Sequence, residues 1–597
     1  MDVAVATIDP AGTKLAEFDS PNGRTGPEVV RLTATTAGNY TIEVRSIEEG
    51  APAGAYDIRV LAMGAKPSTP AEEMDAYLAN YSTTDAPGLA IAVMKNGESI
   101  YRKGYGMADL EHNVSVTPNT VFHVASISKQ FTALAALLLA AEGKLSLDED
   151  VRKYLPELPI YAHPITIRDL AQHTSGLRDV DELLRLSGIG QDDAATNAEV
   201  LGILLRQTGL NFTPGTAFEY SNSGFILLAE VVARVSGKPF STFMQERVFT
   251  PLGMKDTRIL DMPGAVVPNK AYSYGAEGST FVKRPVNHTI IGSTGLNTTV
   301  DDLCLWAKNF GTPVVGDRAL IDRLQRSGTL ANGDPISYAL GLDHKTYRAQ
   351  HVIFHGGGDA GYRAYLVCIP EHRFVVAITS NAQEFNPVEA AERAIDYFLA
   401  EEVERTEPKA STKKPRRSKY DPLTGEYEIF PGRILSVKRA DRGLAIQFAP
   451  GDAPVPLEEV DENVFKLGNA YNRFVFHTSA DGKAYRLDNH IYDFTWGGPK
   501  VTLAPVDVAA IRSADFLGTY LSSELGGVLS VAVSDGGLVV SGHRGGPFPM
   551  RPFQRDSFTT EAGHMGLLTF ERDGKGAING CRVSGSRARN ILFERVR

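Results

Sequence analysis

The chain has 597 residues, which is too long for a single hydrophobic core and predicts roughly three to five domains. Apolar residues make up 43% and charged residues 22%, as in an ordinary globular protein, and the formal net charge of -10 argues against a nucleic-acid partner. The longest apolar run, Phe131 to Ala141, is far shorter than the roughly 20 residues that span a bilayer, so we expect no integral membrane segment.

Metal-binding and redox motifs are absent from the sequence. The three cysteines, Cys304, Cys368 and Cys581, form no C-x-x-C pair, there is no H-E-x-x-H, and acidic and histidine residues do not cluster. We therefore expect no metal and no cofactor. The opening residues, MDVAVATIDPAG, contain neither a basic nor an apolar leader segment, so we expect no signal peptide in this sequence.

Residues 1–63 predict an N-terminal β module. Apolar and polar residues alternate in three stretches separated by turn residues, which predicts strands at 29–34, 39–46 and 55–62. The segments "AGNYTIEVRS" and "GAYDIRV" resemble the pre-peptidase C-terminal type of β-sandwich, of which this module would be a fragment. That type commonly accompanies exported bacterial hydrolases, so the resemblance implies a periplasmic or extracellular protein.

Residues 70–402 predict one mixed α+β domain. Two adjacent strands open the segment and two more close it, with helices between them, which indicates an antiparallel sheet built from both ends of the segment. The strands are expected at 88–95, 98–104, 362–369 and 373–380. The helices are expected at 70–83, 126–142, 182–207, 223–236, 240–249, 299–310 and 386–402.

The C-terminal part predicts a basic linker at 403–419 and two β-barrel repeats, at 420–505 and 509–597. Both repeats show short alternating strands with D-G or G-G turns, typical of small antiparallel barrels. A period this long indicates duplicated domains, not a solenoid. The matching segments are "LTGEY" with "FLGTY" and "ILSVKRADRGLAIQ" with "VLSVAVSDGGLVVS".

A possible nucleophile lies in "FHVASISKQFTALAALLL", which reads as a loop followed by a helix. Ser126 would lie in the first turn, with Lys129 on the same face. A serine needs a base to take its proton, and a partly buried lysine amine can be neutral enough to serve. By chance alone, a capping serine beside a surface lysine is the commoner explanation of this spacing.

Two further segments add polar groups. In "TPGTAFEYSNSGFILLAEVV", Tyr220 could lose its proton more easily beside a lysine, and Asn222 could bind a substrate amide. In "HGGGDAGYRAYLVCIP", His355 precedes glycines that allow close approach of a ligand to the backbone. His123 and His173, which lie near these motifs, are expected to be structural.

The three segments together resemble the serine β-lactamase and penicillin-binding protein superfamily, in its class C β-lactamase-related branch. The family motifs Ser-x-x-Lys, Tyr-x-Asn and Lys-Thr-Gly or His-x-Gly stand here as Ser126–Lys129, Tyr220–Asn222 and His355–Gly357. The flanking segments "LAQHTSGL", "PLGMKDT" and "GSTGLNTTVDDLCLWA" are also typical of the family. The resemblance covers about residues 75–400 and implies an antiparallel sheet with flanking helices plus a helical lobe.

The resemblance also implies a serine hydrolase that works through an acyl-enzyme. Ser126 would be the nucleophile, Lys129 and Tyr220 would share the proton, and either could be the base, since they would titrate as a unit. The backbone N–H groups of Ser126 and Gly358 would form the oxyanion hole, with Asn222, His355 and Gly357 beside the substrate.

His355 departs from Lys-Thr-Gly, because an imidazole holds a substrate carboxylate less well than a fixed ammonium. His-x-Gly and two trailing barrels resemble D-aminopeptidases, which implies hydrolysis of small D-residue peptides. Short-chain esterases of the family are the close alternative. A weak β-lactamase or DD-peptidase and a non-catalytic β-lactam- or peptide-binding sensor stay open. A small molecule or peptide is the expected partner, and the sequence does not fix the oligomeric state.

Two other motifs are excluded by their context. "GGGDAG" satisfies G-x-G-x-x-G, but the segment after it predicts a strand where a dinucleotide site requires a helix. "HGGG" matches an oxyanion motif of α/β-hydrolases, but their G-x-S-x-G elbow is absent from the sequence.

Overall fold

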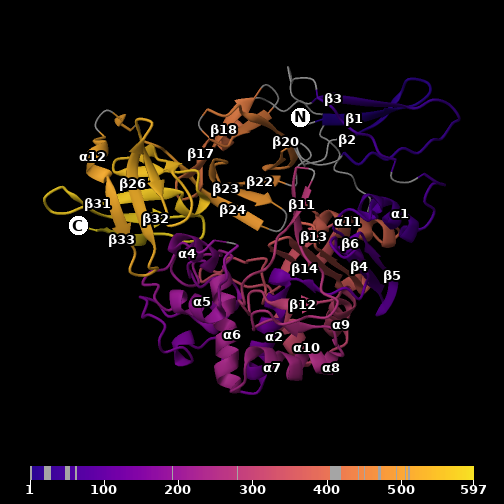
Figure 1. Cartoon of the computed structure of the whole chain (residues 1–597), viewed down its shortest axis with the longest axis horizontal. Helices are drawn as coiled ribbons and strands as arrows, with labels where there is room; N and C mark the ends of the chain where they lie inside the picture. The colour runs from indigo at the N-terminus through magenta and orange to yellow at the C-terminus, as the bar shows by residue number, and fades with distance from the viewer. Residues whose placement is uncertain are drawn as a thin grey trace.

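The computed structural model describes residues 3–18, 28–46, 54–60, 63–190, 192–278, 280–403, 419–440, 443–449, 451–467, 472–491, 494–504, 506–508 and 511–596 (Figure 1). Residues 404–418 of the predicted basic linker lie outside this range. The chain forms an N-terminal β-sheet, an α+β domain and two C-terminal β domains.

The α+β domain is organised around one six-stranded antiparallel sheet with the order β13-β14-β15-β16-β4-β5. Its first two strands in sequence, β4 (Leu89–Lys95) and β5 (Glu98–Tyr105), pair onto β16 (Phe374–Ser380), next to β15 (Tyr362–Ile369). The expectation of a sheet built from both ends of the segment is therefore confirmed. Two strands that were not predicted, β13 (Asp343–Tyr347) and β14 (Gln350–Asp359), extend the other edge.

The sheet is buried on both faces. Successive side chains of a strand point to opposite sides, and each side packs into its own cluster. Ala90, Ala92 and Met94 pack into the larger core, while Leu89, Ile91 and Val93 pack into a separate cluster. That second cluster includes α1 (Pro70–Tyr77) and α11 (Pro387–Phe398), and α9 (Val300–Gly311) packs on the other face. Such coverage explains the unbroken apolar run of β4.

A helical lobe stands beside the sheet. Its centre is α2 (Ser128–Ala141), buried on nearly every side, packed against α6 (Asn222–Ser236). One long helix was expected at 182–207, but two shorter helices form there, α4 (Val180–Ser187) and α5 (Asn197–Leu204). The break has a physical cause: Gly188 ends α4 in the left-handed conformation and Thr196 begins α5 with a capping box.

Short elements complete the α+β domain. Its remaining helices are α3 (Ile167–Ala171), α7 (Phe240–Met244), α8 (Thr250–Leu252) and α10 (Arg318–Gln325). Its remaining strands are β6 (Met107–Asp109), β7 (Val114–Ser115), β8 (Phe122–His123), β9 (Arg258–Ile259), β10 (Tyr274–Glu277), β11 (Thr280–Lys283) and β12 (Leu296–Thr298).

The N-terminal module differs from its prediction. It is a three-stranded antiparallel sheet of β1 (Val3–Ile8), β2 (Lys14–Phe18) and β3 (Thr41–Ser46), in the order β2-β1-β3. The strand expected at 39–46 is confirmed, but residues 29–34 and 55–60 form no strand. Alternation alone does not pair a strand, because a partner must also supply a hydrophobic face.

The two C-terminal domains are antiparallel β structures, as expected. The first is a closed barrel of eight strands, and the second is a nine-stranded sheet with the order β28-β27-β26-β25-β33-β32-β31-β30-β29. The barrel strands are β17 (Gly425–Phe430), β18 (Arg433–Ala440), β19 (Gly443–Gln447), β20 (Val455–Asp461), β21 (Val464–Lys466), β22 (Asn472–Thr478), β23 (Ala484–Ile491) and β24 (Phe494–Val501).

The second domain opens with α12 (Ser513–Phe516) and keeps the local geometry of the first. Tyr427 donates a hydrogen bond to the Leu423 carbonyl at 2.6 Å, and Tyr520 donates to the Phe516 carbonyl at 2.7 Å. The two tyrosines occupy the same place in the repeated segments. The strands are β25 (Gly518–Leu521), β26 (Val528–Ser534), β27 (Gly537–Ser541), β28 (Phe548–Pro549), β29 (Arg551–Gln554), β30 (Ser557–Thr559), β31 (Leu567–Arg572), β32 (Ile578–Ser584) and β33 (Ile591–Arg595).

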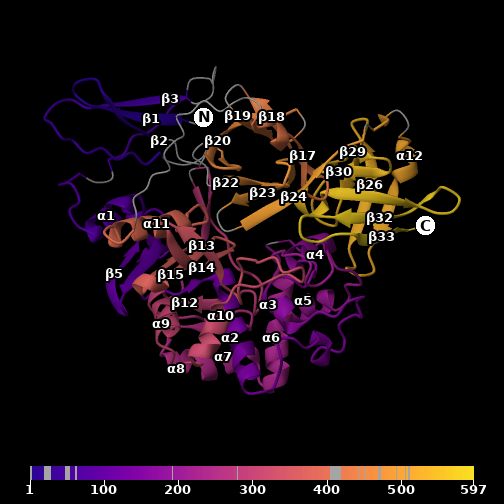
Figure 2. The same cartoon turned by 180° about the vertical axis from the view of Figure 1, so that it is seen from behind.

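The second β domain packs directly on the helical lobe, over α4 and α5, as Figures 1 and 2 show from both sides. Its core residues belong to the same buried cluster as those of the lobe, whereas the first barrel has a cluster of its own. A buried ion pair crosses the contact, with Arg178 Nη1 2.6 Å from Glu524 Oε2. Among the described residues, no helix has the length and apolar character needed to cross a membrane.

Candidate active site

Ser126 lies in a tight turn at the start of the buried helix α2. The turn is the 3-10 segment η2 (Ala125–Ile127), and Ala125 has φ of 46°, a conformation that residues other than glycine rarely adopt. Strain of this kind concentrates at functional sites, where the surrounding structure fixes it. The turn thus presents the Ser126 hydroxyl at the helix N-terminus, close to the predicted position.

Lys129 lies one turn further along and is fully buried. Its amine donates hydrogen bonds to Ser126 Oγ at 2.9 Å, to Asn222 Oδ1 at 2.7 Å and to the Ser293 carbonyl at 2.9 Å. Burial lowers the pKa of Lys129 to about 7, against the charge of Asp181, which raises it. An amine with this pKa is partly neutral at pH 7 and can accept a proton.

Tyr220 reaches the same serine from the segment before α6. Its phenol is hydrogen-bonded to Ser126, and Lys129 Nζ lies 4.8 Å from the centre of its ring. Burial raises the pKa of Tyr220 above its ordinary value. The expectation of a lowered pKa is therefore wrong, because burial outweighs the hydrogen bond to Ser126 and the charge of Arg587, which lower it. The phenol stays protonated in the free protein and is a hydrogen-bond donor.

His173 holds Tyr220 in place. Its ring lies 4.2 Å from the ring of Tyr220, measured between centroids, and its Nδ1 accepts a hydrogen bond from the Ser221 N–H at 3.1 Å. Burial lowers the pKa of His173 well below its ordinary value, so the ring is neutral. The prediction of a structural histidine is correct, and its contact makes it a positioning residue.

Asn222 is the first residue of α6, and both ends of its side chain are engaged. Oδ1 accepts from Lys129, and Nδ2 donates to Asp181 Oδ2 at 2.9 Å. Its backbone N–H donates to Asp179 Oδ2 at 2.7 Å. The side chain therefore orients the lysine amine, and its contact with a substrate amide stays a prediction.

His355 is buried on strand β14 and is neutral. Its Nδ1 lies 2.6 Å from the Gly356 carbonyl, which can only accept, so Nδ1 carries the proton and Nε2 accepts from the Tyr338 hydroxyl at 2.9 Å. Burial, together with the charge of the nearby Lys129, lowers the pKa of His355 to about 3. The third motif thus supplies no positive charge to the site.

The glycines after His355 bring β14 against the nucleophile turn. A Cβ atom at Gly357 would lie 2.2 Å from the Val124 carbonyl oxygen, so the close approach requires glycine there. At Gly358 a Cβ atom would meet nothing nearer than 3.7 Å, at the Arg363 guanidinium. Gly358 is therefore not required sterically, and its place in the oxyanion hole stays a prediction.

The family follows from comparison with known proteins. The family model described as Beta-lactamase matches residues 73–400, which is more than half of the chain and contains every residue of the predicted site. The chain belongs to the Beta-lactamase family. The sheet, the helical lobe and the Ser126–Lys129–Tyr220 cluster occupy that matched segment.

Beta-lactamase-family relatives extend over most of the chain. A D-aminopeptidase of Gluconobacter oxydans (strain 621H) is 28% identical, covering 85% of this chain and 96% of its own. A D-aminopeptidase of Brucella melitensis biotype 2 (strain ATCC 23457) is 27% identical with the same coverage. Together with the family match, these relatives identify the protein as a serine hydrolase.

Solved structures support the same fold. The octameric penicillin-binding protein homologue from Pyrococcus abyssi matches 71% of this chain and 99% of its own, with a TM-score of 0.52 and 23% identity. SurE matches 72% of this chain and 98% of its own, with a TM-score of 0.52 and 21% identity. At these identities the likeness shows the Beta-lactamase-family fold alone.

The second β domain completes the electrostatics of this Beta-lactamase-family site. In the loop between β32 and β33, Arg587 Nη2 lies 3.2 Å from Asp179 Oδ1 and 3.5 Å from Asp181 Oδ2. Burial raises the pKa of Asp179 to about 7, and the charge of Arg587 opposes that rise. Arg587 also lowers the pKa of Lys129. A residue near the end of the chain therefore helps to set the protonation state of Lys129.

Sequence reasoning missed several groups of the site. Asp179 and Asp181 lie two and four residues after the recognised segment "LAQHTSGL", so their position carried a usable signal. Tyr338 and Arg587 carried none, because only the folded chain brings them to the catalytic groups.

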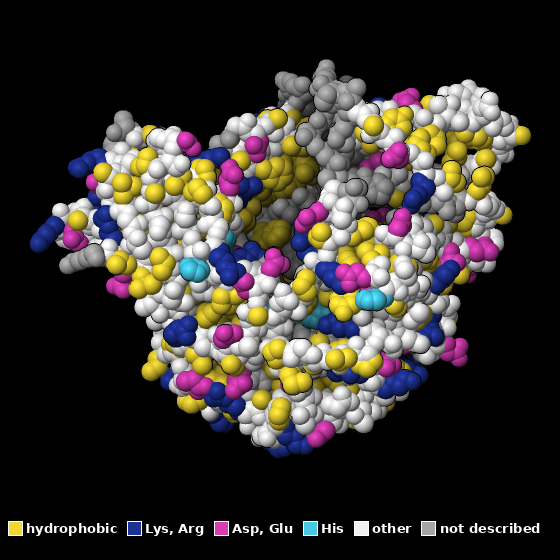
Figure 3. All heavy atoms as spheres, in the orientation of Figure 1, with side chains coloured by type: hydrophobic (Ala, Val, Ile, Leu, Met, Phe, Trp, Pro, Cys, Tyr) yellow, Lys and Arg dark blue, Asp and Glu magenta, His cyan; other side chains and the backbone are white. Residues whose placement is uncertain are grey.

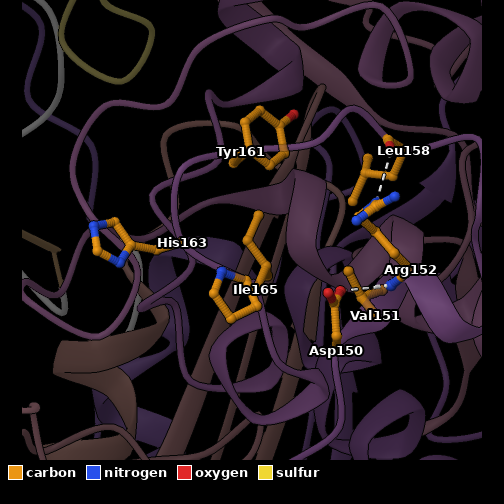
Figure 4. Close-up of a pocket in the computed structure, with 8 residues that line it drawn as sticks. Asp150, Val151, Arg152, Leu158, Tyr161, His163 and Ile165 are labelled. Carbon is orange, nitrogen blue, oxygen red and sulfur yellow. Dashed lines mark hydrogen bonds between the residues drawn. The ribbon is translucent and has the colours of Figure 1, made fainter.

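Two hollows of the protein can be seen in Figures 3 and 4. Figure 3 shows a hollow that opens between the first barrel and the α+β domain. Figure 4 shows a separate pocket, in which the Arg152 backbone N–H donates to Asp150 Oδ1 at 2.8 Å and Arg152 Nε donates to the Leu158 carbonyl at 3.3 Å. None of the catalytic residues lines that pocket, whose walls are Asp150, Val151, Arg152, Leu158, Tyr161, His163, Pro164 and Ile165.

Proposed function

We propose that the protein is an aminopeptidase that releases amino-terminal D-residues from short peptides and amides. The observation that carries the proposal is the charge of the site. The neutral His355 offers no fixed cation to a substrate carboxylate, whereas Asp179, Asp181 and Asp359 all act electrostatically on Lys129. Arg587 is already paired with the first two of these carboxylates. Such a site favours a substrate with a free amine over one with a free carboxylate.

The preference for D-residues is supported by the relatives. Both D-aminopeptidases align with 85% of this chain, a share too large for the α+β domain alone. The C-terminal β domains, one of which reaches the site, are therefore part of the likeness.

The chemistry follows from the cluster. Lys129 takes the proton of Ser126 as Oγ attacks the substrate carbonyl, and backbone N–H groups of Ser126 and Gly358 stabilise the oxyanion. Tyr220, protonated and hydrogen-bonded to Ser126, passes a proton to the leaving amine and recovers one from Lys129. A water molecule then hydrolyses the Ser126 ester and restores the free enzyme.

The test is a comparison of D- and L-alanine p-nitroanilide. We expect kcat/KM to favour the D-substrate by about 100-fold or more, the discrimination that a few kcal/mol of transition-state binding gives. Equal rates, or a preference for the L-substrate, would remove the stereochemical part of the proposal. Rapid turnover of nitrocefin with no cleavage of either anilide would support a β-lactamase instead.

A further inference from the structure

Asp359 lies at the end of β14, on the same side of the strand as His355. Side chains two residues apart on a strand share a face, so His355, Gly357 and Asp359 point together toward the nucleophile turn. A Cβ atom at Gly357 would lie 2.2 Å from the Val124 carbonyl oxygen, so the strand passes close to that turn. Asp359 therefore follows directly along the wall that passes Ser126.

The neighbours of Asp359 are next to catalytic groups in sequence. Its Oδ2 lies 2.9 Å from His123 Nε2, and His123 precedes the turn that holds Ser126. The same oxygen lies 3.4 Å from the hydroxyl of Thr294, which adjoins Ser293, the residue whose carbonyl holds the Lys129 amine. His288 Nε2 is the third neighbour, at 3.0 Å. Two of these three neighbours, His123 and Thr294, thus lie on segments that also carry groups of the candidate site.

One oxygen of this carboxylate is available to a ligand. All three hydrogen bonds of Asp359 go to Oδ2, and within the described part of the chain Oδ1 has no partner. The side chain is 25% exposed, so solvent and substrate can reach it. A carboxylate with one unused oxygen in a cleft is a natural acceptor for an ammonium donor.

The charge of the cluster resides mainly on Asp359. Burial alone would raise its pKa, but hydrogen bonds from His123 and His288 hold the pKa well below its ordinary value, so the carboxylate is ionised. Burial lowers the pKa of His123, which is neutral. The hydrogen bond to Asp359 raises the pKa of His288 against burial, so His288 partly offsets the negative charge.

We propose that Asp359 binds the free α-ammonium group of the substrate through Oδ1 and thereby selects amine-bearing acyl groups. The inference rests on the proposed aminopeptidase function and names the group that recognises the amine. The acyl carbonyl has to lie at Ser126, and the α-amine is only two bonds from that carbonyl. Asp359 lies on the strand that passes the nucleophile, so its carboxylate is placed to receive this amine.

The experiment measures amine selectivity, defined as the ratio of kcat/KM for D-alanine p-nitroanilide to that for its N-acetyl derivative. Asp359→Asn should lower this ratio by about 10- to 100-fold, the value of a charge-assisted hydrogen bond, chiefly by raising KM for the free amine. A purely structural role would instead lower kcat for both substrates alike. Asp359→Glu, which keeps the charge, should retain most of the ratio.

Two matched variants sharpen the result. His288→Gln keeps a donor to Asp359 but removes the positive charge, so it should raise amine selectivity by about 3-fold. Asp109→Asn breaks another Asp–His pair, 2.7 Å from Asp109 Oδ2 to His112 Nδ1, outside the site and should leave the ratio unchanged. If Asp359→Asn does not fold, His288→Gln carries the test alone.

Different outcomes would overturn the proposed role of Asp359 and the proposed D-aminopeptidase function. Unchanged amine selectivity in Asp359→Asn, or a lower ratio in His288→Gln, would overturn the role of Asp359. A wild-type protein that prefers free amines but shows no preference for D- over L-alanine p-nitroanilide would overturn the D-specific function and leave the ammonium site intact.

Discussion

The Lys129 amine lies 2.9 Å from the Ser126 hydroxyl and is cut off from solvent. Burial lowers the pKa of this lysine to about 7, while burial raises that of Tyr220. The same loss of solvation acts in opposite directions on the two groups, because it always disfavours the charged form. It therefore makes Lys129 the better base and Tyr220 the better acid.

The first prediction concerns pH. With p-nitrophenyl acetate, which does not titrate in this range, kcat/KM should rise as the pH passes through about 7, because only the neutral amine can accept the Ser126 proton. Below that pH Lys129 is protonated and activity falls. Lys129→Arg, which stays charged, should lose about 1,000-fold in kcat/KM. A profile with no inflection near pH 7 would contradict the assignment of Lys129 as the base.

The second prediction concerns the charges around Lys129. Arg587 lowers the pKa of the lysine and Asp181 raises it. Arg587→Gln should therefore shift the inflection of the pH profile to higher pH, and Asp181→Asn should shift it to lower pH. Arg589→Gln is the control, because Arg589 lies in the same loop but pairs with Glu219. Shifts of both variants in one direction would contradict this electrostatic arrangement.

The third prediction concerns the contact between the second β domain and the helical lobe. Arg178 and Glu524 are 3% and 10% exposed, so Glu524→Gln leaves a buried guanidinium without its counter-charge. It should lower the free energy of unfolding by about 3–5 kcal/mol. Arg544→Gln, at the solvent-exposed pair with Asp193 in the same contact, should cost less than about 1 kcal/mol. Chemical denaturation measures the free energy of unfolding of both variants. Equal losses would refute the claim that the buried pair stabilises this contact more than the exposed pair does.

The fourth prediction compares two adjacent glycines of β14. Gly357→Ala places a methyl group against the Val124 carbonyl and should lower the free energy of unfolding by about 1–3 kcal/mol. Gly358→Ala would make only an ordinary contact with the Arg363 side chain, at 3.7 Å, and should change it by less than about 0.5 kcal/mol. Thermal or denaturant unfolding of the pair provides the measurement. A larger loss of unfolding free energy for Gly358→Ala than for Gly357→Ala would mean that β14 approaches the turn differently.

Local sequence patterns were sufficient to predict those features of the fold and of the candidate site that depend on residues close together in the chain. The Ser126–Lys129 spacing predicted two groups on one helix face, and unbroken apolar runs predicted the central strands. The sequence could not show that Arg587 would meet Asp179, because that contact depends on how two domains dock. The missing strands at 29–34 and 55–60 show the converse, since alternation does not ensure a pairing partner.

The most direct test of the account is mass spectrometry of the intact protein, quenched at intervals after mixing with p-nitrophenyl acetate. We predict an acetyl adduct that forms on Ser126, as peptide mapping would show, and then disappears as the ester is hydrolysed; Ser126→Ala should form none. An adduct on another residue, or turnover by Ser126→Ala at the wild-type rate, would contradict the mechanism. An adduct on Ser126 that never disappears would identify a sensor and not an enzyme.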